Sequence, residues 1–470
     1  MELNGETVKY HREFDAVFVD LPEDIIPGRQ YTLTIGYSGK PRNAPNPPWE
    51  GGFVWKRDKH FHRWVGVACE QYGASSWWPV KDHLSDRPDS MNIHIEVPSK
   101  FQAISNGQLR GVDTLSDGFS RYNWHVSYPI NSYNVTFYMG KYTEFTDSIM
   151  WNDSLLTLRY HVMPYNLDIA REHFKQARDV VRVYNDAFGP FPFWRDDFRM
   201  VESPYEGMEH QTAIAYGNAY NNSKNSESYL NGNFDYIIVH EAAHEWWGNS
   251  VAAADMADVW LHEGFATYAE YVFLEAMLGY DKAREEIHHK MIYILDIWPM
   301  VQNYNVNEDA FAGGDVYTKG ATMLHCLRAT INNDSLFTDL IRNFQLSYRD
   351  STCNSDDFID FVNQYTGKDF SAFFSKYLYD TGLPVLEYSY TRENGGIRLK
   401  YKWDEVEDGF EMPLAIKTFD TEHAIRLMAT TKEQEIFLEN AKSFNFYNEF
   451  VPLDNCPRNS LTYFRTRARL

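Results

Sequence analysis

Two histidines one helical turn apart, followed by a glutamate after eighteen intervening residues, constrain this chain more than any other feature. Residues 240–264 read HEAAHEWWGNSVAAADMADVWLHEG. Because an α-helix has about 3.6 residues per turn, His240 and His244 project from one face of a helix. Two neutral imidazoles at this separation can bind one zinc ion, and Glu241 lies close enough to act as general base on a water bound there. The pentapeptide alone also occurs by chance, so the prediction depends on a third ligand further along the chain.

Glu263 provides the third ligand that a catalytic zinc site needs. It lies early in a second helical pattern, VWLHEGFATYAEYVFLEAML. Two histidines and one carboxylate leave one position of the ion open for water, whereas a structural zinc is closed by four protein ligands. The sequence therefore predicts one zinc ion per chain, held by His240, His244 and Glu263. For Glu270 two interpretations stay open, namely a partner of a zinc-binding histidine or an exposed helix residue.

Four segments, which follow the family's order along the chain, resemble the M1 family of zinc aminopeptidases, a branch of the gluzincins. One is the zinc motif followed by WLHEGFA, and another is PYEGMEH at 204–210, which resembles the family's exopeptidase motif, usually Gly-x-Met-Glu-Asn. VYTKGA at 316–321 resembles the segment of the catalytic tyrosine, and ACEQ at 68–71 resembles a segment that binds the substrate amine. The similarity runs from about Tyr31 to about Pro384.

The resemblance implies a role for several of these residues. Tyr317 would donate a hydrogen bond to the oxyanion that forms during peptide hydrolysis. Glu209 and Glu70 would pair with the α-ammonium group of the substrate. Gly207 and Met208 would lie on an edge strand, where backbone groups can pair with the peptide. This set of residues is typical of an enzyme that acts on the N-terminal residue of a peptide.

One position departs from the family pattern, because His210 stands where asparagine is usual. The departure keeps the amine-binding carboxylate but leaves the local hydrogen bonding and the preferred residue open. We expect a zinc aminopeptidase that acts on peptides with a free N-terminal amine. Three alternatives stay open: an added epoxide hydrolase activity, as in one branch of the family, a catalytically weak peptide-binding scaffold, and an endopeptidase of the thermolysin type. Glu209 and Glu70 disfavour the last of these.

Composition and charge argue against several classes of partner. The 470 residues carry a formal net charge of −22, which disfavours nucleic acid and anionic membranes. The four cysteines are too few and too scattered for a disulfide framework, and Cys326 is expected to be a buried apolar residue. The chain has no apolar run near the ~20 residues needed to cross a bilayer and no signal-peptide pattern at its start. We expect a soluble protein, cytoplasmic or exported. The resemblance implies further strands before Tyr31, so the question of whether the N-terminus is trimmed stays open. The sequence also leaves the oligomeric state open.

The order of patterns predicts a multidomain α+β protein in three parts. Alternating apolar residues indicate that residues 1–160 form an antiparallel β-domain. Helical periodicity dominates residues 161–383, which by resemblance would form a thermolysin-like, mostly helical catalytic domain. Short strand patterns return in residues 384–470, which would form a β-sandwich-like domain.

Several elements have predicted boundaries within these parts. Alternation predicts strands at 31–37, 91–97 and 156–162. A helix over Phe174–Phe188 should stop at Gly189, and Gly248-Asn249 should end the helix of the zinc motif. Ser355 is the expected N-cap of a helix that stops at Gly367. The turn Asn394-Gly395 between two alternating runs predicts a hairpin.

Overall fold

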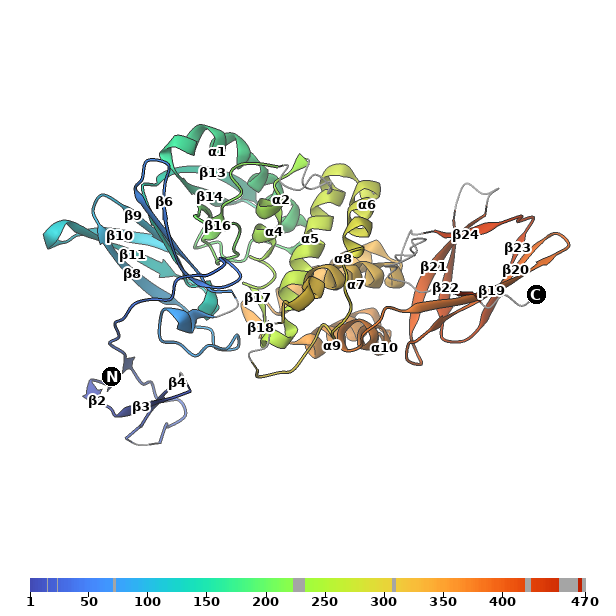
Figure 1. Ribbon diagram of the computed structural model, residues 1–470, viewed down its shortest axis with the longest axis horizontal. Helices are drawn as coiled ribbons and strands as arrows, with labels where there is room; N and C mark the ends of the chain where they lie inside the picture. Colours follow the sequence, from blue (N-terminus) through green and yellow to red (C-terminus); the bar gives the residue numbers. More distant parts are fainter. Residues whose placement is uncertain are drawn as a thin grey trace.

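The computed structural model describes residues 1–14, 16–22, 24–70, 73–222, 233–306, 310–418, 424–447 and 464–466. Strands lie at both ends of the chain, and helices are concentrated between them, as Figure 1 shows. The chain is therefore a multidomain α+β protein, as the sequence predicts. No helix in the described part of the chain is long and apolar enough to cross a membrane.

The N-terminal part consists of short antiparallel sheets. Their strand orders are β2-β1-β5, β3-β4, β6-β7-β12-β9 and β10-β11-β8. The strands are β1 Glu2–Leu3, β2 Glu6–Thr7, β3 Tyr10–Glu13, β4 Ala16–Val19, β5 Leu33–Thr34, β6 Gly52–Arg57, β7 Arg63–Ala68, β8 Met91–Pro98, β9 Gln102–Ser105, β10 Gln108–Thr114, β11 Phe119–Val126 and β12 Phe137–Gly140.

Two strand predictions in this part have different outcomes. The strand predicted at 91–97 is confirmed as β8, whose exposed and half-buried residues alternate along most of its length. The strand predicted at 31–37 is reduced to Leu33–Thr34, because β1, its one partner among the described strands, pairs with it over two residues.

The next sheet joins the N-terminal strands to the helical region. It has the order β13-β14-β15-β16, formed by Thr143–Trp151, Ser154–Val162, Phe198–Glu202 and Ile214–Tyr216. β14 confirms the strand predicted at 156–162, and it pairs antiparallel with β13 but parallel with β15. This sheet crosses the boundary predicted at residue 160. The division into three domains, with its exact limits, stays a prediction.

The helices of the central part surround a large apolar core. They are α1 Leu167–His173, α2 Lys175–Phe188, α4 Tyr236–Ala243, α5 Trp260–Leu278, α6 Tyr280–Met291, α7 Asp315–Ile331, α8 Asp334–Ser347, α9 Ser355–Thr366, α10 Ser371–Phe374 and a π-helix at Ser375–Tyr379, with the parallel pair β17 Val251–Ala253 and β18 Ser351–Cys353. Short 3₁₀ turns lie at Ala74–Ser76, Ser116–Gly118, Ser132–Asn134, Pro164–Asn166, Met256–Asp258 and Ala312–Gly314.

The caps of these helices explain where they begin and end. The helix predicted before Gly189 is confirmed as α2, with Gly189 as its C-cap at φ 103°. The N-cap of α9 is Asn354, not the predicted Ser355. The Asn354 side chain accepts from the N–H of Asp357, and the Asp357 side chain accepts from the N–H of Asn354. Both candidates are good cap residues, so only the backbone geometry distinguishes them. Gly367 ends α9, as predicted.

The C-terminal part contains two sheets, β23-β20-β19-β25 and β22-β21-β24. Their strands are β19 Val385–Glu393, β20 Gly396–Asp404, β21 Glu411–Thr418, β22 Ile425–Thr430, β23 Gln434–Glu439, β24 Phe444–Tyr447 and β25 Phe464–Thr466. The predicted hairpin is confirmed, because Glu393 pairs with Gly396 across the turn. Residues from both sheets, such as Leu399 and Leu414, belong to one buried cluster. The β-sandwich-like assignment stays a prediction.

Candidate metal and catalytic site

The two histidines of the zinc motif lie at the end of α4. Asp235 caps this helix by accepting from the N–H of Ile237 at 3.1 Å. α4 ends at Ala243, and His244 keeps helical dihedral angles as its C-cap, so the spacing of one turn is preserved. The predicted end at Gly248-Asn249 is wrong. The N–H of Asn249 donates to the carbonyl of His244, five residues back, and the regular helix has already stopped.

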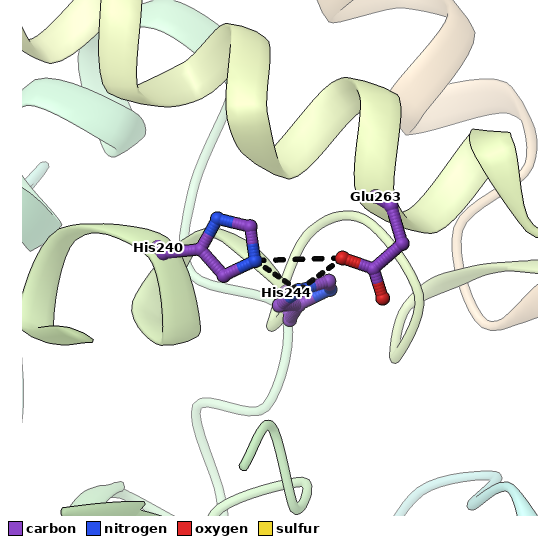
Figure 2. Close-up of side chains that lie close together, drawn as sticks. All are labelled: His240, His244 and Glu263. Atoms are coloured by element: carbon purple, nitrogen blue, oxygen red, sulfur yellow. Dashed lines mark hydrogen bonds and ion pairs between the residues drawn. The ribbon is translucent and has the colours of Figure 1, made fainter. Parts of the chain in front are cut away.

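The third predicted ligand comes from α5, which packs against α4. Figure 2 shows the side chains of His240, His244 and Glu263 pointing toward one another. The two Nε2 atoms are 3.2 Å apart, and each lies 3.4 Å from Oε2 of Glu263. A tetrahedral zinc ion with bonds of about 2.0–2.1 Å keeps its donor atoms about 3.3 Å apart. The three atoms therefore have the separation that such an ion requires.

The outer hydrogen bonds of the two imidazoles determine which nitrogens face the centre. Nδ1 of His244 donates to the carbonyl of Trp247 at 3.0 Å, and Nδ1 of His240 donates to the carboxylate of Glu270 at 2.8 Å. In the neutral rings both Nε2 atoms then carry a lone pair. Oε2 of Glu263 is buried and has no hydrogen-bond partner among the described residues. With both rings neutral, three electron-pair donors therefore point toward one another, which is an arrangement that suits a cation.

Glu270 is one of the partners that hold the first histidine. It is 3% exposed, and its second oxygen contacts Nζ of Lys290 from α6. Of its two interpretations, the structure favours the partner of a zinc-binding histidine over the exposed helix residue. Burial opposes protonation of His240, but the carboxylates of Glu263 and Glu270 outweigh it and raise the pKa of this imidazole.

Glu241 lies beside the three convergent side chains and directly against Gly207. A Cβ atom at Gly207 would collide with the carboxylate of Glu241, so the glycine gives that carboxylate its space. Oxygen or nitrogen atoms of Glu241, His244 and Glu209 lie within 4.8 Å of one another. Burial, reinforced by the neighbouring carboxylate of Glu209, raises the pKa of Glu241 to about 8.

The segment with Gly207 and Met208 lies beside β16 at the end of its sheet. The N–H of Ala215 in β16 donates to the carbonyl of Met208 at 2.9 Å, in a single antiparallel bridge. Glu209 follows this bridge and is buried, with Oε1 accepting from the hydroxyl of Tyr133 at 3.0 Å. Nδ2 of Asn249 donates to the carbonyl of Glu209 at 2.8 Å.

Glu70 belongs to the same acidic cluster. Burial raises its pKa well above the ordinary value, and the negative charges of Glu209, Glu263 and Glu241 add to the effect. Burial raises the pKa of Glu209 as well. Because these carboxylates oppose each other's ionisation, the cluster favours a bound cation. A metal ion and a substrate ammonium group would each meet this need.

Tyr317 reaches the cluster from the first turn of α7. Gly264 of α5 and Gly320 of α7 face each other so closely that a Cβ on Gly320 would lie 2.8 Å from Cα of Gly264. This close approach of the helices brings the Tyr317 ring to 6.1 Å from the ring of His240. Burial, with the nearby carboxylate of Glu263, raises the pKa of Tyr317, so its hydroxyl stays protonated and can donate.

His210 is turned into the core rather than toward the ligand cluster. The hydroxyl of Tyr138 donates to the carbonyl of Ala213 at 2.8 Å, so it accepts from Nδ1 of His210, also at 2.8 Å. Burial lowers the pKa of His210 to about 3, which keeps the ring neutral. The histidine that stands where the family usually has asparagine therefore forms a buried hydrogen bond with Tyr138 beside the site.

Sequence reasoning missed Tyr133, Asn249 and Lys290 as partners of site residues. Tyr133 and Lys290 lie in segments with no motif, and their roles arise only from contacts between distant parts of the chain. Cys326 is fully buried on α7, as predicted.

Comparisons with known proteins agree in their similarity to M1 peptidases and aminopeptidases. The model of the Peptidase family M1 domain matches residues 165–377. Human endoplasmic reticulum aminopeptidase 1 is 22% identical over 359 residues, which cover 74% of this chain and 38% of that protein. Tricorn protease-interacting factor F2 of Thermoplasma acidophilum is 22% identical over 407 residues, which cover 82% of this chain and 50% of that protein. The chain thus spans half or less of the length of these two relatives.

Two solved structures show the same fold. A mutant M1 zinc metallopeptidase from Deinococcus radiodurans, bound to the substrate Tyr-Ser-Ala, has a TM-score of 0.67 at 21% identity and covers 82% of this chain and 84% of that one. Legionella pneumophila aminopeptidase A, in complex with aspartic acid, has a TM-score of 0.77 at 17% identity. The likeness extends over 100% of this chain and 54% of that one.

Proposed function

Since the model of the Peptidase family M1 domain matches the centre of this chain, we propose that the protein is a zinc aminopeptidase that removes N-terminal residues from peptides. The observation that carries the proposal is the convergence of His240, His244 and Glu263 beside the acidic residues Glu209 and Glu70. The first three side chains suit a metal, and the last two suit an ammonium group.

His240, His244 and Glu263 would hold one zinc ion per chain in a thermolysin-like catalytic domain. The spacing of their donor atoms and the unpartnered Oε2 of Glu263 support this assignment. When bound, zinc would supply a Lewis acid that lowers the pKa of water to about 7 and polarises the scissile carbonyl.

Glu241 would act as the general base and then as the general acid. Its Oε atoms would take a proton from the attacking water and deliver it to the departing nitrogen. Burial, reinforced by the carboxylate of Glu209, raises the pKa of Glu241 to about 8, and a divalent cation nearby would lower that pKa. Gly207 would keep the carboxylate free of steric contact.

Tyr317 would donate a hydrogen bond from its hydroxyl to the oxyanion that develops on the scissile carbonyl. Removing one such donor typically costs about 10²–10³ in rate. The position of its ring beside His240 supports this role, because the substrate carbonyl would lie next to the metal ligands.

Glu209 and Glu70 would bind the α-ammonium of the substrate and so restrict cleavage to the first peptide bond. Tyr133 would hold the Glu209 carboxylate in place through its hydroxyl. Gly207 and Met208 would present backbone groups to the peptide from the open side of β16. The complete set of ligands, together with Glu241, argues against a catalytically weak scaffold.

A panel of chromogenic aminoacyl substrates tests this function. We expect hydrolysis of several members of the panel, loss of activity with a zinc chelator, and recovery when zinc is added back. Glu263→Gln should lose both zinc and activity, while Glu275→Gln on the same helix, remote from the cluster, serves as the control. Full activity of protein that contains no metal would contradict the proposal.

A further inference from the structure

A polar cavity lies between the N-terminal strands and the sheet β13-β14-β15-β16. Side chains of β9, β10, β11, β13, β14 and β15 line the cavity. Its volume is about 340 Å³, which is large enough for a small organic molecule. The polar residues that line it are Gln102, Gln108, Glu144, Arg159, His161 and Arg199.

Arg199 is the central cation of this cavity and is only 1% exposed. Its Nη1 donates to the carbonyls of Gly107 at 2.8 Å and Thr212 at 2.7 Å, and its guanidinium lies 4.9 Å from the ring centre of Trp124. Among the described residues, Nε has no acceptor, and no hydrogen bond is formed by Nη2. The Nε and Nη2 edge of a guanidinium is the edge that pairs with two oxygens of a carboxylate or phosphate.

Three carboxylates carry charge near this arginine: Asp197 and Glu144 are engaged by Arg159, and Asp196 accepts from the N–H of Ser127 at 2.8 Å. Nε of Arg159 donates to Asp197 at 2.7 Å, and Nη1 of Arg159 donates to Glu144 at 2.9 Å. Within the described parts of the chain, no carboxylate forms an ion pair with Arg199. A buried guanidinium usually has such a partner, because desolvation of an unpaired charge is costly.

His161 adds further unused hydrogen-bonding groups to the same cavity. It lies on β14, is 5% exposed, and neither ring nitrogen has a partner among the described residues. Burial lowers its pKa, and the positive charges of Arg199 and Arg159 add to this effect, so the ring is neutral. A neutral imidazole can donate one hydrogen bond to an anion without adding charge.

We propose that this cavity binds a small oxyanion, a carboxylate or a phosphate, through the free edge of Arg199 with His161 as a further hydrogen-bond donor. The ligand would form an ion pair with Arg199 and would supply hydrogen-bond acceptors for both buried side chains. The site is separate from the zinc ligands and does not depend on the proposed peptidase activity.

Thermal unfolding of the full-length, zinc-loaded protein tests this proposal. Sodium acetate and sodium phosphate are titrated separately against sodium chloride at equal ionic strength. We expect a saturable rise in the midpoint temperature with at least one oxyanion and none with chloride. The acetate and phosphate arms distinguish a carboxylate ligand from a phosphate ligand.

Three variants locate the binding. Arg199→Lys keeps the charge but loses the planar edge, so the concentration that gives half of the shift should rise at least tenfold. His161→Phe should also raise the anion concentration that gives half of the shift. If Arg199→Lys does not fold, the result with His161→Phe tests the proposal. Arg121→Lys is the matched control and should bind normally, because this half-buried arginine of β11 pairs with Glu96 of β8 and does not line the cavity. An equal shift with chloride would overturn the proposal. An oxyanion shift that both cavity variants retain unchanged would also overturn it, since the anion would then bind outside this cavity.

Discussion

Replacing Glu270 with glutamine should weaken zinc binding, although Glu270 is not itself one of the proposed zinc ligands. Glu270 is 3% exposed, and Oε1 lies 2.8 Å from Nδ1 of His240. The bond fixes the tautomer that presents Nε2 to the metal, and the negative charge makes the imidazole a stronger donor. Glu270→Gln keeps the shape of the side chain but removes the charge and leaves Lys290 without its ion-pair partner.

The loss of zinc affinity can be estimated from the hydrogen bond between Glu270 and His240. Loss of a partner of a metal-binding histidine typically costs 10–100-fold in metal affinity. This corresponds to about 1.4–2.8 kcal/mol of binding free energy. Lys290→Gln should give a smaller loss, because the bond between Glu270 and His240 remains and the Lys290 side chain is 26% exposed.

Competition with a chromophoric chelator measures the zinc dissociation constant directly. Glu275→Gln is the matched control, since this glutamate lies on the same helix but pairs with Arg328. Its zinc affinity should equal that of the unmodified protein. If Glu270→Gln also bound zinc with unchanged affinity, the argument that Glu270 positions His240 would be refuted.

Three further predictions concern chemistry and pH. Glu241→Gln should keep stoichiometric zinc by elemental analysis but lose nearly all turnover, because the ligands remain while the proton carrier is gone; normal turnover would show that another base acts. Tyr317→Phe should lower kcat by about 10²–10³ with little change in KM, as steady-state kinetics would reveal, and a near-normal kcat would remove Tyr317 from the oxyanion role. The pKa of His210 is lowered to about 3 by burial, so its contribution to stability is present above pH 6.5 and is lost as the pH falls toward 3. In urea unfolding, the free energy of unfolding of His210→Gln should therefore fall less steeply between pH 6.5 and 3 than that of the unmodified protein, by up to about 1.4 kcal/mol per pH unit. Equal slopes for the two proteins would contradict the assignment.

The parts of the site that local spacing determines could be predicted from the sequence. His240 and His244 share a helix face by periodicity alone, and the structure brings Glu263 to both of them. The resemblance to a family selected Glu209 and Tyr317, which the structure places in the same acidic cluster. These predictions depended on short motifs that match the family pattern although the chain is only 22% identical to relatives such as human endoplasmic reticulum aminopeptidase 1.

Other features depend on packing between distant segments and leave no local pattern. The hydroxyl of Tyr133 reaches Glu209 across 76 positions of sequence, and Lys290 reaches Glu270 from the next helix. The sheet that joins β14 to β15 crosses the predicted domain boundary, because strand pairing does not follow composition. The free edge of Arg199 likewise becomes visible only when neighbouring acids are seen to pair with Arg159.

The central claim is that the site requires a free, protonated N-terminal amine. The most direct measurement compares kcat/KM for a peptide and for its N-acetylated form. Acetylation removes the ammonium group and leaves Glu209 and Glu70 without a cation, and an unpaired buried charge typically costs about 3–5 kcal/mol. We therefore predict that the acetylated peptide is cleaved at least about 10²-fold less efficiently. Equal kcat/KM values for the two peptides would contradict the aminopeptidase account and would indicate an endopeptidase with the same metal ligands.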